Sequence, residues 1–188
     1  SGLRGLDYSR PLATMRTYLE AMDASPFTAP SPPEPPLRLL AALGPRMLAL
    51  SAELADGAHP YWTTPEHTAT AREIMGPDAL LCVEQKVVLS TDAETARAAG
   101  RGALGLYADL PNYRNNWKRL GFTDAEIDDR ADRFIDAVVA WGDADALNER
   151  VQAHYDAGAS HVCVQPVHPE GRFGSPHWEA LEALAPAG

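Results

Sequence analysis

The stretch 37–57 constrains the fold of this chain more than any other part of the sequence. It opens with a short apolar run, Leu37 to Ala42, which is typical of a parallel strand buried on both faces. Gly44-Pro45 ends that run, and proline suits the first turn of a helix because its φ is already helical and its missing N–H is not needed there. Behind the turn, apolar residues recur with helical spacing at Met47, Leu50 and Leu54. The stretch therefore predicts a strand, a tight turn and a helix that ends at Gly57.

This arrangement places the N-terminus of a helix at the carboxyl end of a strand. Free backbone N–H groups and the positive end of the helix dipole favour an anion there, so the turn is a candidate phosphate site. A Gly-Pro turn is also ordinary punctuation between a strand and a helix. Neither G-x-G-x-x-G nor G-x-x-x-x-G-K-[ST] occurs, so the sequence gives no support to a dinucleotide-binding Rossmann fold or a P-loop.

Strands and helices are predicted to alternate along the chain. An N-terminal unit is expected over 1–23, with the last helix of the absent half over 9–23. A stiff crossover is expected over 24–36, where six prolines in thirteen residues exclude helix and sheet interior. Four strand–helix units are expected over 37–188, with strands near 37–42, 58–62, 80–89 and 161–165. Their helices are expected from Pro45, from Thr64-Pro65 to Met75, after the capping box Thr91-x-x-Glu94, from Thr123 through Val138, from Asp143 to Gly158, and from Ser175-Pro176 to Ala185.

This alternation predicts an α/β fold of parallel strands joined by right-handed crossovers. At 188 residues the chain is expected to form a single domain with a sizeable core. Four parallel strands alone would make a small open sheet. The segment 106–120, with three large aromatic residues, is expected to form an interface or a pocket rim.

Several segments together carry a resemblance to a known family. AALGPRMLALSAELADGAHPYWTTPEHT resembles the segment that holds the cofactor phosphate in the bacterial-luciferase-like family, and within it the oxidoreductases that use the deazaflavin coenzyme F-420. Further matches, in the same order as in the family, are YSRPLATMRTYLEAMD, VEQKVVLSTDAETARAAGR, LGLYADLPNYRNNWKRLGF and DAGASHVCVQPV. The resemblance implies a TIM barrel with insertions, whose catalytic face is the ring of loops at the carboxyl ends of the strands.

A complete (β/α)₈ barrel runs to about 250 residues. The resemblance also starts partway through the family pattern, so the chain is expected to be a partial barrel: the C-terminal strands and helices with an extra helical insertion. The implied activity is hydride transfer between F-420 and an organic substrate. The alternatives are an FMN-dependent monooxygenase of the same family, because the same turn serves both cofactors, and a non-catalytic flavin-binding or structural partial barrel.

The resemblance also implies the cofactor-binding residues. The backbone at Gly44, Pro45, Arg46 and Met47 is expected to meet the cofactor phosphate, beside a strand end kept slim by Ala41 and Ala42. Arg46 either adds a charge-assisted contact or is a solvated helix residue.

In the family the loop after the second strand contacts substrate and cofactor, which implies a substrate pocket lined by His59, Tyr61, Trp62, Thr63 and Thr64. A lone histidine beside proline is more often structural than catalytic. The two aromatic residues either stack on a ring or seal the top of the barrel. No catalytic residue is assigned, because the acid or base is expected from the absent N-terminal half.

Three further polar residues need an account. Glu84 lies in the middle of a strand and needs a partner if it is buried. A partner from the missing half is expected, or Lys86 if a bulge brings the two side chains to one face. His168 and Arg172 follow the last strand, where many TIM barrels complete a phosphate site. No metal-ligand cluster is expected from the six scattered histidines.

Composition narrows the classes of partner. The net charge of −10 and the pI near 4.9 argue against nucleic acid and anionic membranes, and no apolar stretch approaches the length of a membrane span. The chain is therefore expected to be cytoplasmic, to act on a small molecule, and to keep Cys82 and Cys163 as buried free thiols. Homo-oligomerisation, or association with the missing half, is expected because the inward-facing Leu81, Val83 and Val164 would otherwise lack an opposite wall.

Overall fold

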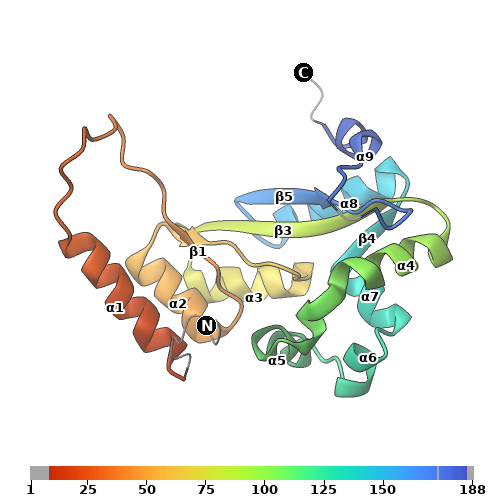
Figure 1. Ribbon diagram of the computed structural model, residues 1–188, viewed down its shortest axis with the longest axis horizontal. Coiled ribbons are helices and arrows are strands. Elements are labelled where there is room, and N and C mark those ends of the chain that lie inside the picture. The colour runs from red at the N-terminus through yellow and green to blue at the C-terminus, as the bar shows by residue number, and fades with distance from the viewer. Residues whose placement is uncertain (1–8, 173, 186–188) are drawn as a thin grey trace.

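The computed structural model describes residues 9–172 and 174–185, and over these ranges the chain forms a parallel β-sheet flanked by helices (Figure 1). The first eight residues of the predicted N-terminal unit lie outside this description. The strands are β1 (Leu39–Leu40), β2 (Gly57–Ala58), β3 (Leu80–Leu89), β4 (Val139–Gly142) and β5 (His161–Pro166). The α-helices are α1 (Pro11–Ala24), α2 (Pro45–Leu54), α3 (Pro65–Met75), α4 (Ala93–Leu104), α5 (Pro111–Arg119), α6 (Asp124–Asp128), α7 (Asp132–Val138), α8 (Ala144–Asp156) and α9 (Trp178–Ala183), and a 3₁₀ turn spans Gly105–Asp109.

The long strand β3 is the centre of the sheet. It pairs with β2 at its start, with β5 along 82–87 and with β4 along 86–89. Because Lys86 and Val87 pair with both β4 and β5, those two strands lie on opposite edges of β3. N–H groups of Leu80 and Glu84 donate toward the chain at β2, whereas the carbonyls of Leu81 and Val87 accept from the chain at β5. The order β1-β2-β3-β5 therefore places the four predicted strands as successive neighbours, as a barrel wall requires.

The strand β4 is an addition that the sequence analysis missed. The helix expected from Thr123 through Val138 is two short helices, and the capping box of Thr123 and Glu126 starts only the first. The chain turns between them at Arg130, whose φ is 48°, and then passes directly from α7 into β4. Both short helices bury apolar residues in the same core. The apolar residues therefore keep a helical spacing across the turn, and the sequence does not reveal the break. The Val-Ala-Trp-Gly run becomes a strand because it pairs with the end of β3.

Strands β1 and β2 are shorter than predicted. Leu37 is 71% exposed and only two residues of the 37–42 run form β1. Gly57, predicted to end a helix, instead belongs to β2. A Cβ at Gly57 would lie only 1.9 Å from the carbonyl oxygen of Leu80, so the close approach of β2 to β3 requires glycine.

The two faces of β3 differ in what covers them. Leu81 and Val83 are fully buried, in one cluster with residues of α2 and α3 and with Val151 of α8, and Val164 is partly buried in the layer that α8 and α9 cover. The expectation that these side chains lack a wall is therefore wrong. Odd-numbered residues of β3 point toward the helices, and the even-numbered Cys82 and Glu84 point to the other face, because side chains alternate along a strand.

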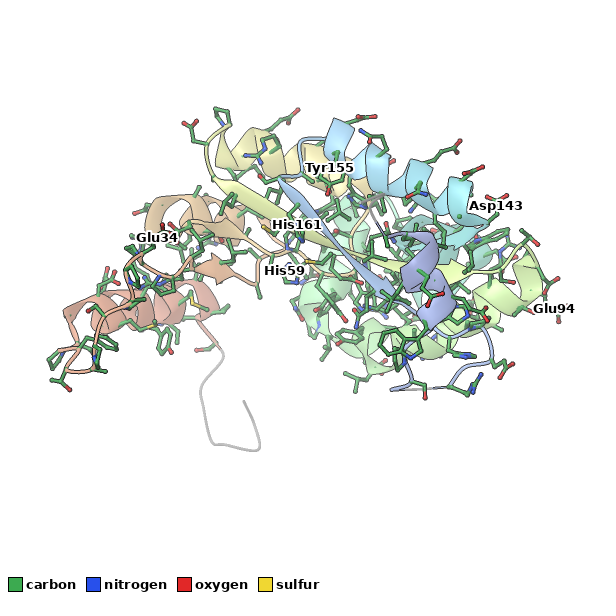
Figure 2. All side chains as sticks on the ribbon, turned by 90° about the horizontal axis from the view of Figure 1, so that it is seen from above. Glu34, His59, Glu94, Asp143, Tyr155 and His161 are labelled. Atoms are coloured by element: carbon green, nitrogen blue, oxygen red, sulfur yellow. The ribbon has the colours of Figure 1, made fainter. Side chains whose placement is uncertain are left out.

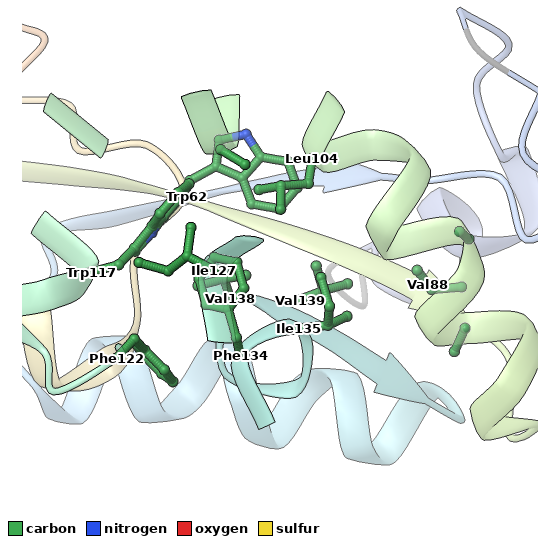
Figure 3. Packing of buried hydrophobic residues seen from close by; sticks show 13 residues of the cluster. Trp62, Val88, Leu104, Trp117, Phe122, Ile127, Phe134, Ile135, Val138 and Val139 are labelled. Carbon is green, nitrogen blue, oxygen red and sulfur yellow. The ribbon is translucent and has the colours of Figure 1, made fainter. Parts of the chain in front are cut away.

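The largest apolar cluster joins α4 to α7 with the carboxyl ends of β3 and β4 (Figure 3). Trp117 of α5 is fully buried in it and packs edge to face on Phe134, with ring centroids 4.8 Å apart. Its Nε1 donates to the backbone carbonyl of Trp62 at 2.9 Å. The three aromatic residues of segment 106–120, which was predicted as an interface or pocket rim, thus lie in this core or pack against it, whereas much of the rest of the segment is exposed.

Helix α1 extends from one end of the molecule and packs against α2 (Figure 1). Within α1 only Leu19 is buried, and the ion pair of Arg16 with Glu53 joins the two helices at 2.6 Å. The proline-rich stretch 25–36 follows without helix or strand. Within the described ranges, no helix has the length and apolar character that crossing a membrane would need.

His154 joins α8 to the sheet and to α3. Its Nε2 lies 2.9 Å from Oε1 of Gln85 in β3, and its Nδ1 lies 2.8 Å from the hydroxyl of Thr68 in α3. The side chain is completely buried, and burial lowers its pKa to about 4 from the ordinary 6.5. The imidazole is therefore neutral in the folded protein at neutral pH.

A depressed histidine pKa stabilises the folded state above the unfolded pKa, and that stability is lost as pH falls toward the folded pKa. Lowering the pH from 7.5 to 5 should therefore reduce the free energy of unfolding by about 2 kcal/mol through His154. Urea unfolding at both pH values measures it, with His154→Gln as the comparison, because glutamine does not titrate. An equal pH dependence in parent and variant would contradict this role.

Candidate functional site

The turn between β1 and α2 has the form that the sequence predicted. Gly44 is the N-cap residue, with an extended backbone at φ −85° and ψ 154°, and its carbonyl accepts from the N–H groups of Met47 and Leu48 at 3.0 Å each. Pro45 has no N–H to offer. Within the described ranges, the N–H groups of Gly44 and Arg46 have no recorded acceptor. Two free donors therefore lie at the positive end of the helix dipole.

Arg119, at the end of α5, lies against this turn. A Cβ built on Gly44 would be 3.5 Å from Nη2 of Arg119, so the guanidinium is in van der Waals reach of the turn. The sequence analysis did not identify Arg119. Its contact with residue 44 comes from packing between distant segments, and no local spacing signals it.

Two buried polar atoms linked to the turn have no hydrogen-bond partner among the described residues. They are Nδ1 of His67 and Nδ2 of Asn116, in side chains that are at most 4% exposed. Buried polar atoms are nearly always paired, so each exception needs an explanation. His67 reaches the turn directly, because its Nε2 donates to the carbonyl of Leu43 at 2.9 Å. Asn116 reaches it through Arg119, whose Nη1 lies 3.5 Å from Oδ1 of Asn116.

The electrostatic character of this region favours an anion. Asn116 offers an unused donor, and Arg119 adds a full positive charge beside the free N–H groups of the turn. Burial lowers the pKa of His67, so the ring is neutral at neutral pH, with its proton on Nε2. We name Gly44, Arg46, Asn116 and Arg119 the donor cluster.

A second polar group, the Lys86 cluster, consists of Tyr61, Glu84, Lys86 and Gln165. Nζ of Lys86 lies 2.8 Å from a carboxylate oxygen of Glu84 and 2.7 Å from the Tyr61 hydroxyl, and it also donates to the side-chain oxygen of Gln165. The charged side chains are almost fully buried, 5% and 3% exposed. The expectation that this pairing needs a bulge is wrong: residues two apart in a strand share a face.

Burial controls the titration of the Lys86 cluster. It raises the pKa of Glu84 and lowers the pKa of Lys86, and in each case the partner's charge opposes that shift. Burial also raises the pKa of the Tyr61 hydroxyl, which donates to Gln165 at 2.7 Å. The cluster therefore holds Tyr61 in one position at the carboxyl ends of β3 and β5.

The same cluster fixes the loop after β2. Trp62 adopts a left-handed φ of 56°, which is strained for a bulky residue, and its N–H donates to Glu84 at 3.2 Å. Nζ of Lys86 lies 3.9 Å from the ring centroid of Tyr61 and 4.6 Å from that of Trp62. Trp62 is 1% exposed, so it seals this end of the core, as one of the two sequence readings expected.

The face of the sheet opposite α3 and α8 is only partly covered. We name it the open face and define it by His59, Cys82, His161, Cys163 and Gln165. Nδ1 of His59 lies 2.7 Å from the Cys82 carbonyl oxygen, and His161 pairs in register with Cys82. Figure 2 labels His59 and His161. The two cysteines are free and partly exposed, so the expectation of buried thiols is wrong.

The remaining predicted residues are spread over several environments. Ala42 is buried beside the turn, whereas Ala41 and Arg46 are exposed. Thr64 caps α3 by accepting from the N–H of His67 at 3.3 Å. Arg172 pairs with Glu170 at 3.1 Å, and the ring of His168 lies near that of His177, with centroids 5.0 Å apart. Over the described ranges, no group of three or more His, Cys, Asp or Glu residues forms a potential metal site.

Breaking the Glu84–Lys86 pair leaves a buried charge without its partner. Lys86→Met should therefore lower the free energy of unfolding by about 3–5 kcal/mol. The double variant Glu84→Gln/Lys86→Met should recover part of that loss in urea unfolding. The matched control is Lys118→Met, whose exposed pair with Asp124 should contribute less than about 1 kcal/mol. A double variant less stable than Lys86→Met alone would refute the pairing argument.

Comparison with known proteins bears on the fold. Searches with protein-family models and against curated protein sequences found no match. Among solved structures, an F-420-dependent secondary alcohol dehydrogenase in complex with an F-420-acetone adduct matches 93% of this chain and 60% of its own, with a TM-score of 0.55 and 16% identity. The coenzyme F-420-dependent tetrahydromethanopterin reductase from Methanopyrus kandleri matches 77% of this chain and 47% of its own, with a TM-score of 0.57 and 18% identity.

A third solved structure, apo-MsnO8, matches 96% of this chain and 61% of its own, with a TM-score of 0.52 and 19% identity. The chain thus spans between about half and three-fifths of the length of the structures it matches. Identities this low establish the fold alone. The chain has the same parallel α/β fold as these structures, which confirms the fold class that the resemblance in the sequence implies.

Proposed function

We propose that this chain is the cofactor-holding part of an F-420-dependent oxidoreductase that transfers hydride between the deazaflavin and an organic substrate. One observation carries the proposal: the donor cluster includes a helix N-terminus at the carboxyl end of β1 with Arg119 against it, in a fold shared with two F-420-dependent enzymes. An anionic cofactor group suits that cluster. Most of the donors that lack a partner inside the chain would gain one from phosphate oxygens.

The residues present fit such a cofactor. Gly44 and Arg46 would donate backbone N–H groups to its phosphate, and Met47 and Pro45 would shape the turn. When bound, F-420 supplies the carbon that gives or accepts hydride. The chain's own part is to orient the ring and to exclude water. Tyr61, fixed by the Lys86 cluster, is the aromatic residue of the pocket loop best placed to contact a ring, because it remains partly exposed.

FMN is the alternative cofactor. It also carries a phosphate, so the donor cluster does not distinguish the two. F-420 is preferred because two of the three structural matches described above are named for it. No residue of this chain is assigned as the catalytic acid or base, which the family resemblance implies would come from other strands of the barrel.

Gly44→Asp tests the phosphate site without disturbing the fold. At φ −85° any residue fits, the nearest side-chain atom leaves room for a Cβ, and aspartate is a favourable N-cap. The unfolding midpoint should therefore stay equal or rise. The new carboxylate would occupy the anion position beside Arg119, so binding of F-420 and FMN should be lost.

Gly44→Asn is the matched comparison, because it has the same shape and cap preference without the charge. It should bind more weakly than the parent, because its side chain fills the same space, but at least about tenfold more tightly than Gly44→Asp, a difference of about 1.4 kcal/mol. Fluorescence titration with F-420 and with FMN gives both affinities for each protein. Equal affinity of the aspartate variant and the parent would refute the site. Tight FMN binding without F-420 binding would instead favour the FMN-dependent alternative.

We also propose that further barrel strands or a second copy of the chain cover this structure in the cell. The outer edge of β5 pairs with no strand in the described part of the chain, and Tyr18, Phe27 and Leu37 are each at least 60% exposed. The chain alone should therefore form dimers or larger species in light scattering. A cooperative, monodisperse monomer would contradict the proposal.

A further inference from the structure

The segment between β3 and β5 contains an arginine, Arg119, whose guanidinium pairs with neither a carboxylate nor a backbone carbonyl of the described residues. Its other basic side chains are satisfied: Arg97, Arg101, Arg114, Lys118 and Arg133 pair with carboxylates, and Arg130 and Arg150 donate to backbone carbonyls. Among the described residues, Arg119 has no carboxylate partner. Its recorded contacts are Asn116, at 3.5 Å, and the turn at Gly44.

Two residues that precede Arg119 on α5 fix its position. Two residues before it, Trp117 is anchored in the core and donates to the carbonyl of Trp62. One turn before it, Asn116 is 2% exposed and accepts from the guanidinium through Oδ1, so its unpartnered Nδ2 belongs to the same amide group beside Arg119. A charged fork that lies against the N-terminus of α2 therefore has a buried amide donor beside it.

We propose that Arg119 and Asn116 are ligands of the cofactor phosphate and that the inserted helix α5 supplies the side-chain half of this site. The inference rests on the proposed function. The β1–α2 turn supplies the backbone half, through Gly44 and Arg46. A guanidinium binds phosphate with two parallel hydrogen bonds, and Nδ2 of Asn116 gains the acceptor that the chain does not give it. A chain of net charge −10 needs such a local positive charge to hold an anion.

This assignment makes the inserted segment a determinant of affinity for phosphate. Loss of Arg119 should weaken ligands that carry a phosphate and leave the same ring systems without phosphate unaffected. A merely structural role would weaken both or neither. The pair FMN and riboflavin, and the pair F-420 and its phosphate-free deazaflavin riboside, separate these cases.

The experiment compares Arg119→Met, Arg119→Lys and, as control, Lys118→Met on the same helix. Arg119→Met should weaken binding of FMN or F-420 by about tenfold or more, because a charge-assisted hydrogen bond is lost. Binding of the phosphate-free rings should stay within about twofold, a change of roughly 0.4 kcal/mol. Arg119→Lys should recover part of the affinity, because it restores charge without the fork. Lys118→Met should match the parent, since Lys118 pairs with Asp124 instead.

Thermal unfolding with inorganic phosphate separates failure of this inference from failure of the proposed function. Arg119 is exposed, so its variants should fold with unchanged midpoints in the absence of ligand. If the parent binds no flavin but phosphate raises its midpoint and not that of Arg119→Met, the function is wrong and the anion site stands. If Arg119→Met binds FMN and F-420 as tightly as the parent does, the inference is overturned.

Discussion

The pairing of β3 with three other strands is the constraint on which the rest of this structure depends. Its first residues bind β2, its middle binds β5, and its last residues bind both β5 and β4. Side chains alternate along β3. Leu81, Val83 and Gln85 therefore point to the face that the helices cover. Glu84 and Lys86 point to the opposite face. Core and candidate pocket are therefore two sides of one strand.

The buried ion pair on that strand has a positioning role. An isolated buried pair contributes little net stability, because desolvation of both charges offsets their attraction. Here the pair also binds the Tyr61 hydroxyl and the backbone of Trp62, so it fixes the loop that follows β2. That loop in turn anchors α5 through the indole of Trp117. A chain of contacts thus leads from β3 to Arg119 at the phosphate turn.

The donor cluster shows how a weak local signal gains strength from tertiary contacts. A Gly-Pro turn at a helix start is common, and its two free N–H groups alone would not indicate a ligand. Asn116 and Arg119 come from a segment far from Gly44 in sequence, and among the described residues Nδ2 of Asn116 has no acceptor and Arg119 has no carboxylate partner. The excess of donors over acceptors gives the turn its specific preference for an anion.

The sequence by itself determined the alternation of strand and helix, the Gly44-Pro45 turn and the luciferase-like resemblance, because each rests on local patterns of apolar residues, glycine and proline. It did not show β4, because the helical spacing of apolar residues continued across the turn at Arg130 and the strand depends on pairing with β3. It did not show Arg119 either. Only the tertiary structure brought that side chain to the turn, because packing of α5 against Trp62 joins residues that no sequence period relates.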